Sequence, residues 1–283
     1  MPKRIVVKEN VVREKATSRQ NYLTIKPKIC CNNYQSYRRL ENQLAVITAA
    51  HDRISKAVAI AYAKEGADLV LIYHHARYEA ELLELKSYLE TYGRKIHLIK
   101  SSTFDEYKCK KLFEQIVKKF GEIDILVNNF PIYHKIEEMD SHYLLKKNDT
   151  LKIQSLFTLG KLAHEYLLPN GVIINTASVC AYSQPDQLVF YSAMKAAIKE
   201  YTQEMHSMLE YYEKKIRVNG ITTGFVWSDT SPEMVEGYEN LPLHFKSIRP
   251  MHPCDIVPLF VFLASKESTI ISGETLNTSG IQK

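Results

Sequence analysis

The sequence has 283 residues, which is long enough for one large domain with a complete hydrophobic core. Its formal net charge is +5, and the Lys and Arg residues are spread among acidic residues, which argues against a nucleic-acid-binding surface. We recognise no signal-peptide pattern and no apolar run of the about 20 residues that span a membrane. The five cysteines show no metal-ligand spacing. We therefore expect a reduced, cytoplasmic protein that works on a small molecule without a metal, a nucleic acid or a membrane.

The first 40 residues differ from the rest of the chain, because short apolar triplets alternate with charges and Tyr-rich polar stretches without a sustained period. We predict that residues 1–40 form an extended N-terminal arm and that residues 41–283 form the folded domain. Two interpretations of the arm stay open. It is ordered in part where it docks on the body, or it is a loose tail.

After residue 40, apolar runs of strand length alternate with helical patterns. The predicted strands are Leu44–Thr48, Asp68–Tyr73, Lys95–Lys100, Ile123–Asn128, the run beginning at Val172, Arg217–Ile221 and Glu274–Asn277. The predicted helices are Ser55–Glu65, Arg77–Tyr92, Asp105–Phe120, Leu144–Leu167, Tyr191–Tyr212 and Asp255–Ala264, with a mixed loop over 226–250. This alternation predicts an α/β fold in a single domain: a doubly wound, Rossmann-like parallel sheet that helices cover on both faces.

The stretch from Gly171 to Lys199 places three reactive side chains around the end of a predicted strand. Ser178 follows the apolar run, and Tyr191 and Lys195 are four residues apart, so they share one face of a helix. An ammonium close to a phenol favours the phenolate and lowers the phenol's pKa, while a serine hydroxyl can hydrogen-bond the same substrate oxygen. This set can give a proton to, or take one from, a carbonyl or alcohol oxygen while hydride moves on the carbon.

These residues resemble the motif of a known family. Ser178, the thirteen-residue step to Tyr191, and the run from Tyr191 to Lys195 are similar to the Ser and Tyr-x-x-x-Lys of the short-chain dehydrogenases/reductases. The similarity runs in register from about Gln43 to Ser279. It is greatest to a bacterial subgroup with an N-terminal extension, described as glucose- or ribitol-dehydrogenase-like.

The resemblance implies an oxidoreductase that uses NAD or NADP and acts on a carbonyl or a secondary alcohol. It assigns Tyr191 as the acid/base, Lys195 as the partner that lowers its pKa and holds the cofactor's ribose, and Ser178 as the donor that orients the substrate oxygen. It also implies a homotetramer or homodimer, with the helices around Leu144–Leu167 and Tyr191–Tyr212 in the interfaces. In the resembling subgroup the N-terminal arm wraps the domain or a neighbouring subunit.

The cofactor loop departs from the family pattern Thr-Gly-x-x-x-Gly-x-Gly. The chain keeps Thr48 but has Ala49, Arg53 and Ser55 at the three glycine positions. Glycine allows positive φ, close approach of the backbone to phosphate and tight helix packing, so all three properties are at risk. Two interpretations stay open. Either Arg53 and the helix-start amides near Ile54 hold the pyrophosphate, or the loop is closed and binds no nucleotide.

Other cofactor positions are altered as well. The family's carboxylate for the adenosine ribose is replaced by His74 and two neighbouring basic residues, which favours a 2′-phosphate and therefore NADP over NAD. The family's Asp near the adenine falls at Ser102, while Asn128 and Gly224 match an Asn after strand four and a Gly after strand six. The candidate cofactor contacts are Thr48, Arg53, Ile54, His74, Ser102, Asn128, Lys195 and Gly224.

Lys152 is the fourth candidate catalytic residue. It falls where the family has an Asn that supports a water relay to Lys195. A second ammonium near Lys195 would lower the pKa of both by like-charge repulsion. Lys152 therefore acts as a proton shuttle, or it points to solvent and the relay is absent.

The sequence leaves three functions open. The intact Ser-Tyr-Lys spacing and Asn128 favour an NAD(P)-dependent oxidoreductase, which is the function we expect. The three lost glycines and Lys152 would instead suit a relative without activity that keeps the fold as a binding or assembly module. The third is a Tyr/Lys-based isomerase or lyase that works without a nicotinamide.

Overall fold

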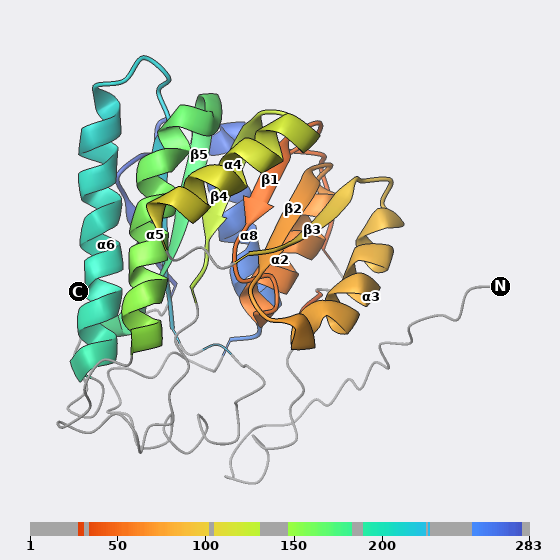
Figure 1. Cartoon of the computed structure of the whole chain (residues 1–283), viewed down its shortest axis with the longest axis horizontal. Helices are drawn as coiled ribbons and strands as arrows, with labels where there is room; N and C mark the ends of the chain where they lie inside the picture. Colours follow the sequence, from red (N-terminus) through yellow and green to blue (C-terminus); the bar gives the residue numbers. More distant parts are fainter. Residues whose placement is uncertain are drawn as a thin grey trace, which may run out of the picture.

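The computed structural model describes residues 28–30, 34–101, 105–130, 147–182, 189–224, 226 and 251–278, of which 147–152 and 189–190 are described by their backbone alone. Strands and helices alternate along these residues (Figure 1). The strands are β1 (Leu44–Ile47), β2 (Asp68–Tyr73), β3 (Ile96–Lys100), β4 (Ile123–Asn128), β5 (Leu167–Ser178), β6 (Arg217–Thr223) and β7 (Thr275–Asn277). The helices are α2 (Arg53–Lys64), α3 (Glu79–Glu90), α4 (Glu106–Phe120), α5 (Lys147–Tyr166), α6 (Val189–Glu210) and α8 (Pro253–Ala264), with 3-10 turns η1 (Ala76–Tyr78), η3 (Val179–Ala181) and η5 (Lys266–Ser268).

These strands lie in one parallel sheet in the order β3-β2-β1-β4-β5-β6-β7. Strands β1 and β4 are neighbours although β2 and β3 come between them in the chain, so the winding reverses at this point. Ligands of doubly wound sheets bind outside the carboxyl ends of the strands at such a reversal. The predicted fold class is therefore confirmed, and the expected site lies beyond the ends of β1, β4 and β5.

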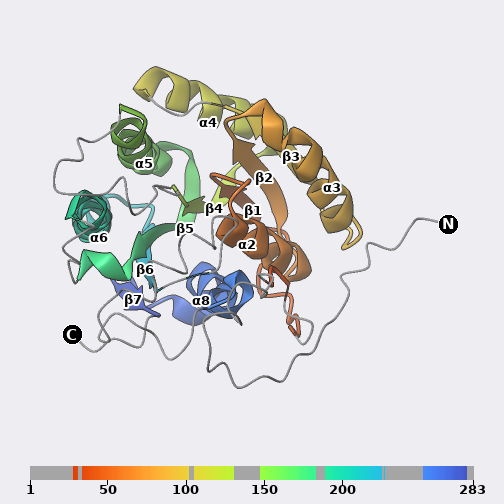
Figure 2. The ribbon, with the colours of Figure 1, turned by 90° about the horizontal axis from the view of Figure 1, so that it is seen from below.

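The helices cover both faces of the sheet. In β1, Ala45 and Ile47 belong to one core, while Leu44 and Val46 belong to the other. Helices α2, α3 and α8 pack in the first core and α4, α5 and α6 in the second, as the view along the sheet shows (Figure 2). Because the strands are buried on both faces, they read as continuous apolar runs in the sequence.

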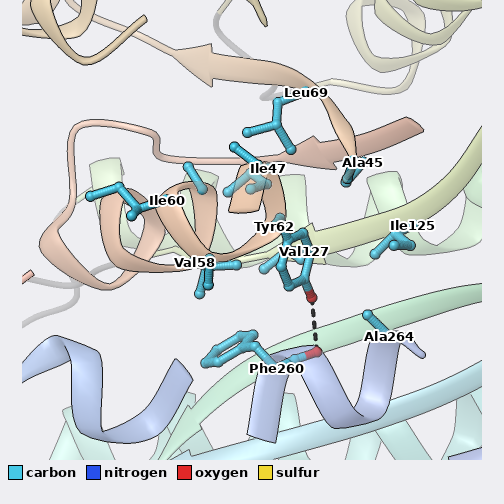
Figure 3. Packing of buried hydrophobic residues seen from close by; sticks show 14 of the residues in the cluster. Ala45, Ile47, Val58, Ile60, Tyr62, Leu69, Ile125, Val127, Phe260 and Ala264 are labelled. Carbon is cyan, nitrogen blue, oxygen red and sulfur yellow. Dashed lines mark hydrogen bonds between the residues drawn. The ribbon is translucent and has the colours of Figure 1, made fainter. Parts of the chain in front are cut away.

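Tyr62 joins the two principal helices of the first core (Figure 3). Its side chain is fully buried, and its hydroxyl donates to the Phe260 carbonyl of α8 at 3.0 Å. This bond satisfies a polar group among apolar neighbours, and burial raises the pKa of the phenol well above its ordinary value. Helix α2 is thereby fixed against α8, which holds its first turn at the carboxyl end of β1.

The predicted elements agree with the observed ones to within a few residues at most ends. Helix α2 begins at Arg53, two residues earlier than predicted, because Asp52 caps it. Strand β5 begins at Leu167, before the apolar run that predicted it. Most of the predicted mixed loop over 226–250 lies outside the described residues.

The described part of the N-terminal segment lies against α2 and α8. The backbone amide of Cys254, at the start of α8, donates to the Lys28 carbonyl at 3.2 Å. Glu65, which caps the end of α2, accepts from the Tyr34 hydroxyl at 2.5 Å and from Arg39 Nη2 at 2.7 Å. The rest of the predicted arm lies outside the described residues.

Candidate active site

Ser178 is the last residue of β5 and stands at the carboxyl edge of the sheet. Its backbone pairs with Thr223 at the end of β6, and its side chain caps η3 by accepting from the Cys180 amide at 3.4 Å. The side chain is buried, and the hydroxyl also hydrogen-bonds the Tyr191 phenol. The strand therefore fixes one side of the candidate site.

Tyr191 and Lys195 come from α6, which follows β5 in the chain. Lys195 Nζ lies 5.8 Å from the centroid of the Tyr191 ring, so the two side chains are neighbours as the helical spacing predicted. The Lys195 side chain is buried, and Nζ donates to the Thr176 carbonyl at 3.5 Å. The structure thus brings Ser178, Tyr191 and Lys195 together.

The pKa of Tyr191 is shifted upward, opposite to the effect expected of the neighbouring Lys195 alone. Burial raises the pKa of the Tyr191 phenol well above its ordinary value, the nearby Cys180 and Asp52 raise it further, and the hydrogen bond with Ser178 lowers it. The lowering by Lys195 that the helical spacing predicts does not set the net shift, because burial of the phenol dominates it. Tyr191 is therefore a neutral phenol at neutral pH, which is the form that can donate a proton.

The cofactor loop, residues 48–55, keeps a left-handed turn without glycine. Ala49 has a φ of +47°, a conformation that costs a residue with a side chain about 1–2 kcal/mol. Thr48 Oγ1 donates to the Asn129 carbonyl at 3.0 Å and accepts from the Asn129 amide at 2.9 Å. These two bonds tie the loop to the chain just after β4, so the side chain of Thr48 serves the loop's own structure.

Asp52 lies inside this loop and caps α2. Its Oδ2 accepts from the Ile54 amide at 2.9 Å and from Asn129 Nδ2 at 2.8 Å. Ser55 Oγ donates to the Thr48 carbonyl at 2.9 Å and accepts from the same Asn129 Nδ2 at 2.9 Å. The hydroxyl that replaces the third glycine is therefore part of a buried polar network.

A basic and aromatic cluster lies at the end of β2 beside the loop. His51 stacks on Tyr78 with ring centroids 4.2 Å apart and an interplanar angle of 16°, and His74 meets His51 edge-on at 4.8 Å. The Arg77 guanidinium lies 4.6 Å from the Tyr78 centroid. His74 and Arg77 are exposed, so their polar groups can face a phosphate in solvent.

Asn128 and Gly224 stand at the ends of β4 and β6. Asn128 is fully buried, and its Nδ2 donates to Asn175 Oδ1 at 3.2 Å. Its own Oδ1 is buried and has no hydrogen-bond partner among the described residues. Gly224 follows β6 directly and is partly exposed. Both residues thus lie at the edge of the sheet where the family's cofactor is expected.

Two predicted site residues cannot be placed at this edge by their side chains. Ser102 and the side chain of Lys152 lie outside the described residues. Within the part of the chain that is described, no group of three or more His, Cys, Asp or Glu side chains could hold a metal ion. No described helix is both long and apolar enough to cross a membrane.

The sequence as a whole matches a known family. A family model described as short chain dehydrogenase matches residues 43–239. The chain belongs to the short-chain dehydrogenase family. It is 34% identical over 252 residues to the uncharacterized oxidoreductase YhxC of Bacillus subtilis, and the aligned region covers 86% of this chain and 85% of the relative. It is 31% identical over 273 residues to the chloroplastic NADPH-dependent aldehyde reductase 1 of Arabidopsis thaliana, and the aligned region covers 93% of each chain.

Solved structures share the fold of this chain. A short-chain dehydrogenase from Burkholderia cenocepacia in complex with NADP superimposes with a TM-score of 0.75 at 23% identity, over 86% of this chain and 98% of that one. Relatives named as glucose and ribitol dehydrogenases are among the sequence matches. The predicted resemblance and the oxidoreductase class are therefore confirmed for this member of the short-chain dehydrogenases.

Three contributions to this short-chain dehydrogenase site were not predicted from the sequence: the Asp52 cap, the Ser55 hydroxyl and the Cys180 thiol. An Asp directly before a helix is a recognisable capping signal, so Asp52 could have been found. Its bond to Asn129 crosses 77 residues and has no local signature. Cys180 lies two residues beyond Ser178, but nothing in the spacing indicates that its thiol influences Tyr191.

Proposed function

We propose that this short-chain dehydrogenase reduces a carbonyl, or oxidises a secondary alcohol, with NADP or NAD through Ser178, Tyr191 and Lys195. The observation that carries the proposal is the meeting of these side chains beyond β5. The Ser178 hydroxyl bonds the Tyr191 phenol, and Lys195 Nζ lies 5.8 Å from the Tyr191 ring centroid. A donor, an acid and a cation around one position suit proton transfer to a substrate oxygen.

Each side chain has a distinct role in the proposed reaction. Tyr191, neutral because burial raises its pKa, gives its proton to the carbonyl oxygen. Ser178 donates a hydrogen bond to the same oxygen and so orients the substrate. Lys195 supplies a positive charge that stabilises the phenolate left after the transfer. In the reverse direction the phenolate would accept the proton of an alcohol.

The described residues fit a dinucleotide at both of its ends. Lys195 would lie toward the nicotinamide end, whose ring supplies hydride chemistry when bound. Asn128 Oδ1, which has no hydrogen-bond partner among the described residues, would lie there as well. His74 would lie toward the adenosine end. Arg53, at the first turn of α2, would offer a counter-charge to the pyrophosphate. The remaining contacts that we propose from the family pattern are Thr48, Ile54, Ser102 and Gly224.

The basic residues at the end of β2 support NADP over NAD. His74 and Arg77 are exposed and stand where the family places the adenosine ribose, so they can accompany a 2′-phosphate. The relative named NADPH-dependent aldehyde reductase supports the same cofactor and a carbonyl substrate. Lys152 as a proton shuttle to Lys195 rests on the family pattern alone.

We further propose a homotetramer or homodimer built on α5 and α6. The two helices pack closely: a Cβ on Gly160 would lie 2.6 Å from the Met205 sulfur. Three large side chains at the end of α6 are exposed in the single chain, namely Met208, Tyr211 and Tyr212. Met208 lies in the last turn of α6, and Tyr211 and Tyr212 follow its end. Exposed aromatic and Met side chains gathered at one helix end suit burial against a second copy.

The proposal is tested by Tyr191→Phe, assayed for reduction of a panel of aldehydes and ketones with NADPH and NADH. Loss of the phenol proton should lower kcat by at least about 100-fold, which is the usual contribution of a positioned acid. The matched control is Tyr201→Phe in the same helix, because its hydroxyl donates to the Phe157 carbonyl at 2.6 Å, away from Ser178. Turnover by Tyr191→Phe equal to that of the unaltered enzyme would remove Tyr191 from the mechanism.

A further inference from the structure

The cofactor loop already holds a negative charge at the start of α2. Asp52 Oδ2 accepts a hydrogen bond from the Ile54 amide at 2.9 Å. This amide belongs to the first turn of α2, whose amides are the donors that a pyrophosphate would use. A second donor, Asn129 Nδ2, reaches the same oxygen at 2.8 Å from the chain after β4. The residue is only 6% exposed. The carboxylate is thus anchored from two elements.

Two features make Asp52 more than an ordinary helix cap. Asn129 Nδ2 also donates to Ser55 Oγ, so the carboxylate is one member of a network that ties the loop and the helix start to the chain after β4. In addition, the charge of Asp52 raises the pKa of Tyr191, which places the carboxylate within electrostatic reach of the candidate acid. A dinucleotide running from this loop to Tyr191 would have to pass beside Asp52.

We propose that Asp52 is an internal competitor of the pyrophosphate and sets the affinity of this chain for its dinucleotide. The proposal rests on the proposed function. Like charges at the same helix start repel, and the amide that Asp52 occupies is withdrawn from the ligand. Dinucleotide binding through the Ile54 amide therefore requires the carboxylate to leave Ile54.

The test compares Asp52→Asn with the unaltered full-length chain by calorimetric titration with NADPH, NADH, ADP and adenosine. Asn caps helices about as well as Asp, so the fold and thermal midpoint should be preserved while the charge is removed. At an effective dielectric constant of about 20, two unit charges about 5 Å apart repel enough to change affinity by at least ten-fold. We expect NADPH and ADP to bind at least about ten-fold more tightly, and adenosine to bind unchanged.

A matched control removes the same charge from another helix cap. Asp105 caps α4 and accepts from the Lys108 amide at 2.8 Å, so Asp105→Asn repeats the chemical change after β3 instead of after β1. Its affinities should equal those of the unaltered chain. Asp52→Ser is a second variant that also caps α2, and it should share the gain of Asp52→Asn.

The outcomes separate this inference from the proposed function. Equal, measurable NADPH affinity in the unaltered chain and in both Asp52 variants would overturn the competitor role and leave the proposed function standing. An equal gain for adenosine would also overturn it, because the effect would not follow the phosphate charge. If no variant binds any dinucleotide up to millimolar concentration, Asp52 is not what excludes it, and the proposed function falls as well.

Discussion

Replacing Glu65 by Gln should destabilise the protein, because the carboxylate is the anchor of the N-terminal segment on α2. The side chain is fully buried. It accepts from the Tyr34 hydroxyl at 2.5 Å, from Arg39 Nη2 at 2.7 Å and Nε at 3.3 Å, and from the backbone amides of Arg39 at 2.9 Å and Tyr37 at 3.1 Å. With the Ser36 hydroxyl at 3.4 Å, six donors converge on two oxygens. A glutamine offers only one oxygen, together with an amide group that faces other donors.

The size of the effect follows from these contacts. Removing one partner of a buried ion pair usually costs about 3–5 kcal/mol. The Arg39 side chain is 22% exposed, so water can hydrate part of the abandoned guanidinium and reduce the cost. We expect the free energy of unfolding to fall by about 2–4 kcal/mol, which lowers Tm by about 5–10 °C for a domain of this size.

The assay is thermal unfolding of Glu65→Gln and of Glu267→Gln, each beside the unaltered chain. Glu267 is a matched control because it contacts the same Arg39, at 3.5 Å, with its side chain 54% exposed. An exposed pair contributes at most about 1 kcal/mol, so this variant should melt close to the unaltered chain. If Glu65→Gln melts like Glu267→Gln, the buried carboxylate does not anchor the segment and the reasoning is refuted.

The same effect must depend on pH with a defined sign. Burial raises the pKa of the Glu65 carboxyl, but the hydrogen bonds from Arg39, Tyr34 and two backbone amides outweigh it, so the pKa lies below its ordinary value. Because the folded-state pKa is depressed, the stabilisation is present above the unfolded pKa and is lost as pH falls through the folded one. The difference in Tm between Glu65→Gln and the unaltered chain should therefore shrink on acidification below about pH 4.

Two further predictions concern the proposed enzyme. The raised pKa of Tyr191 keeps the phenol protonated at neutral pH. We therefore expect kcat for alcohol oxidation, which needs the phenolate, to rise with pH on the alkaline side, while kcat for carbonyl reduction does not need alkaline pH. A flat pH profile for oxidation would contradict this role of the phenol. The proposed packing of α5 and α6 between copies predicts a tetramer or dimer by light scattering at micromolar concentration, and a monomer there would contradict it.

The sheet could be predicted because each strand carries its own signal. β2 and β4 are apolar runs that match their predicted ranges, since burial on both faces removes the need for polar positions. Ser178, Tyr191 and Lys195 could be predicted for a similar reason. One strand end and one helix deliver all three, so their spacing along the chain carries the geometry.

The electrostatics of the site could not be predicted in the same way. The ammonium of Lys195 is close to Tyr191 as the helical spacing requires, yet the pKa of Tyr191 rises. The spacing gives the neighbour but not the burial of the phenol, nor the approach of Cys180 and Asp52 from other elements. A pKa depends on every group around the atom, and most of these groups are distant in the sequence.

In the cofactor loop, the three substituted glycines are the visible departure from the family pattern, but they are not the main obstacle to pyrophosphate binding that we propose. Ala49 accepts the left-handed conformation, Arg53 stands at the start of α2, and Ser55 uses its hydroxyl to bond the Thr48 carbonyl. The left-handed conformation of Ala49 costs about 1–2 kcal/mol, and Arg53 and Ser55 do not adopt a positive φ. The greater obstacle to a pyrophosphate is the carboxylate of Asp52, a residue at a position where the family pattern has no requirement. We therefore expect Asp52→Asn to raise the affinity for NADPH more than Ala49→Gly does.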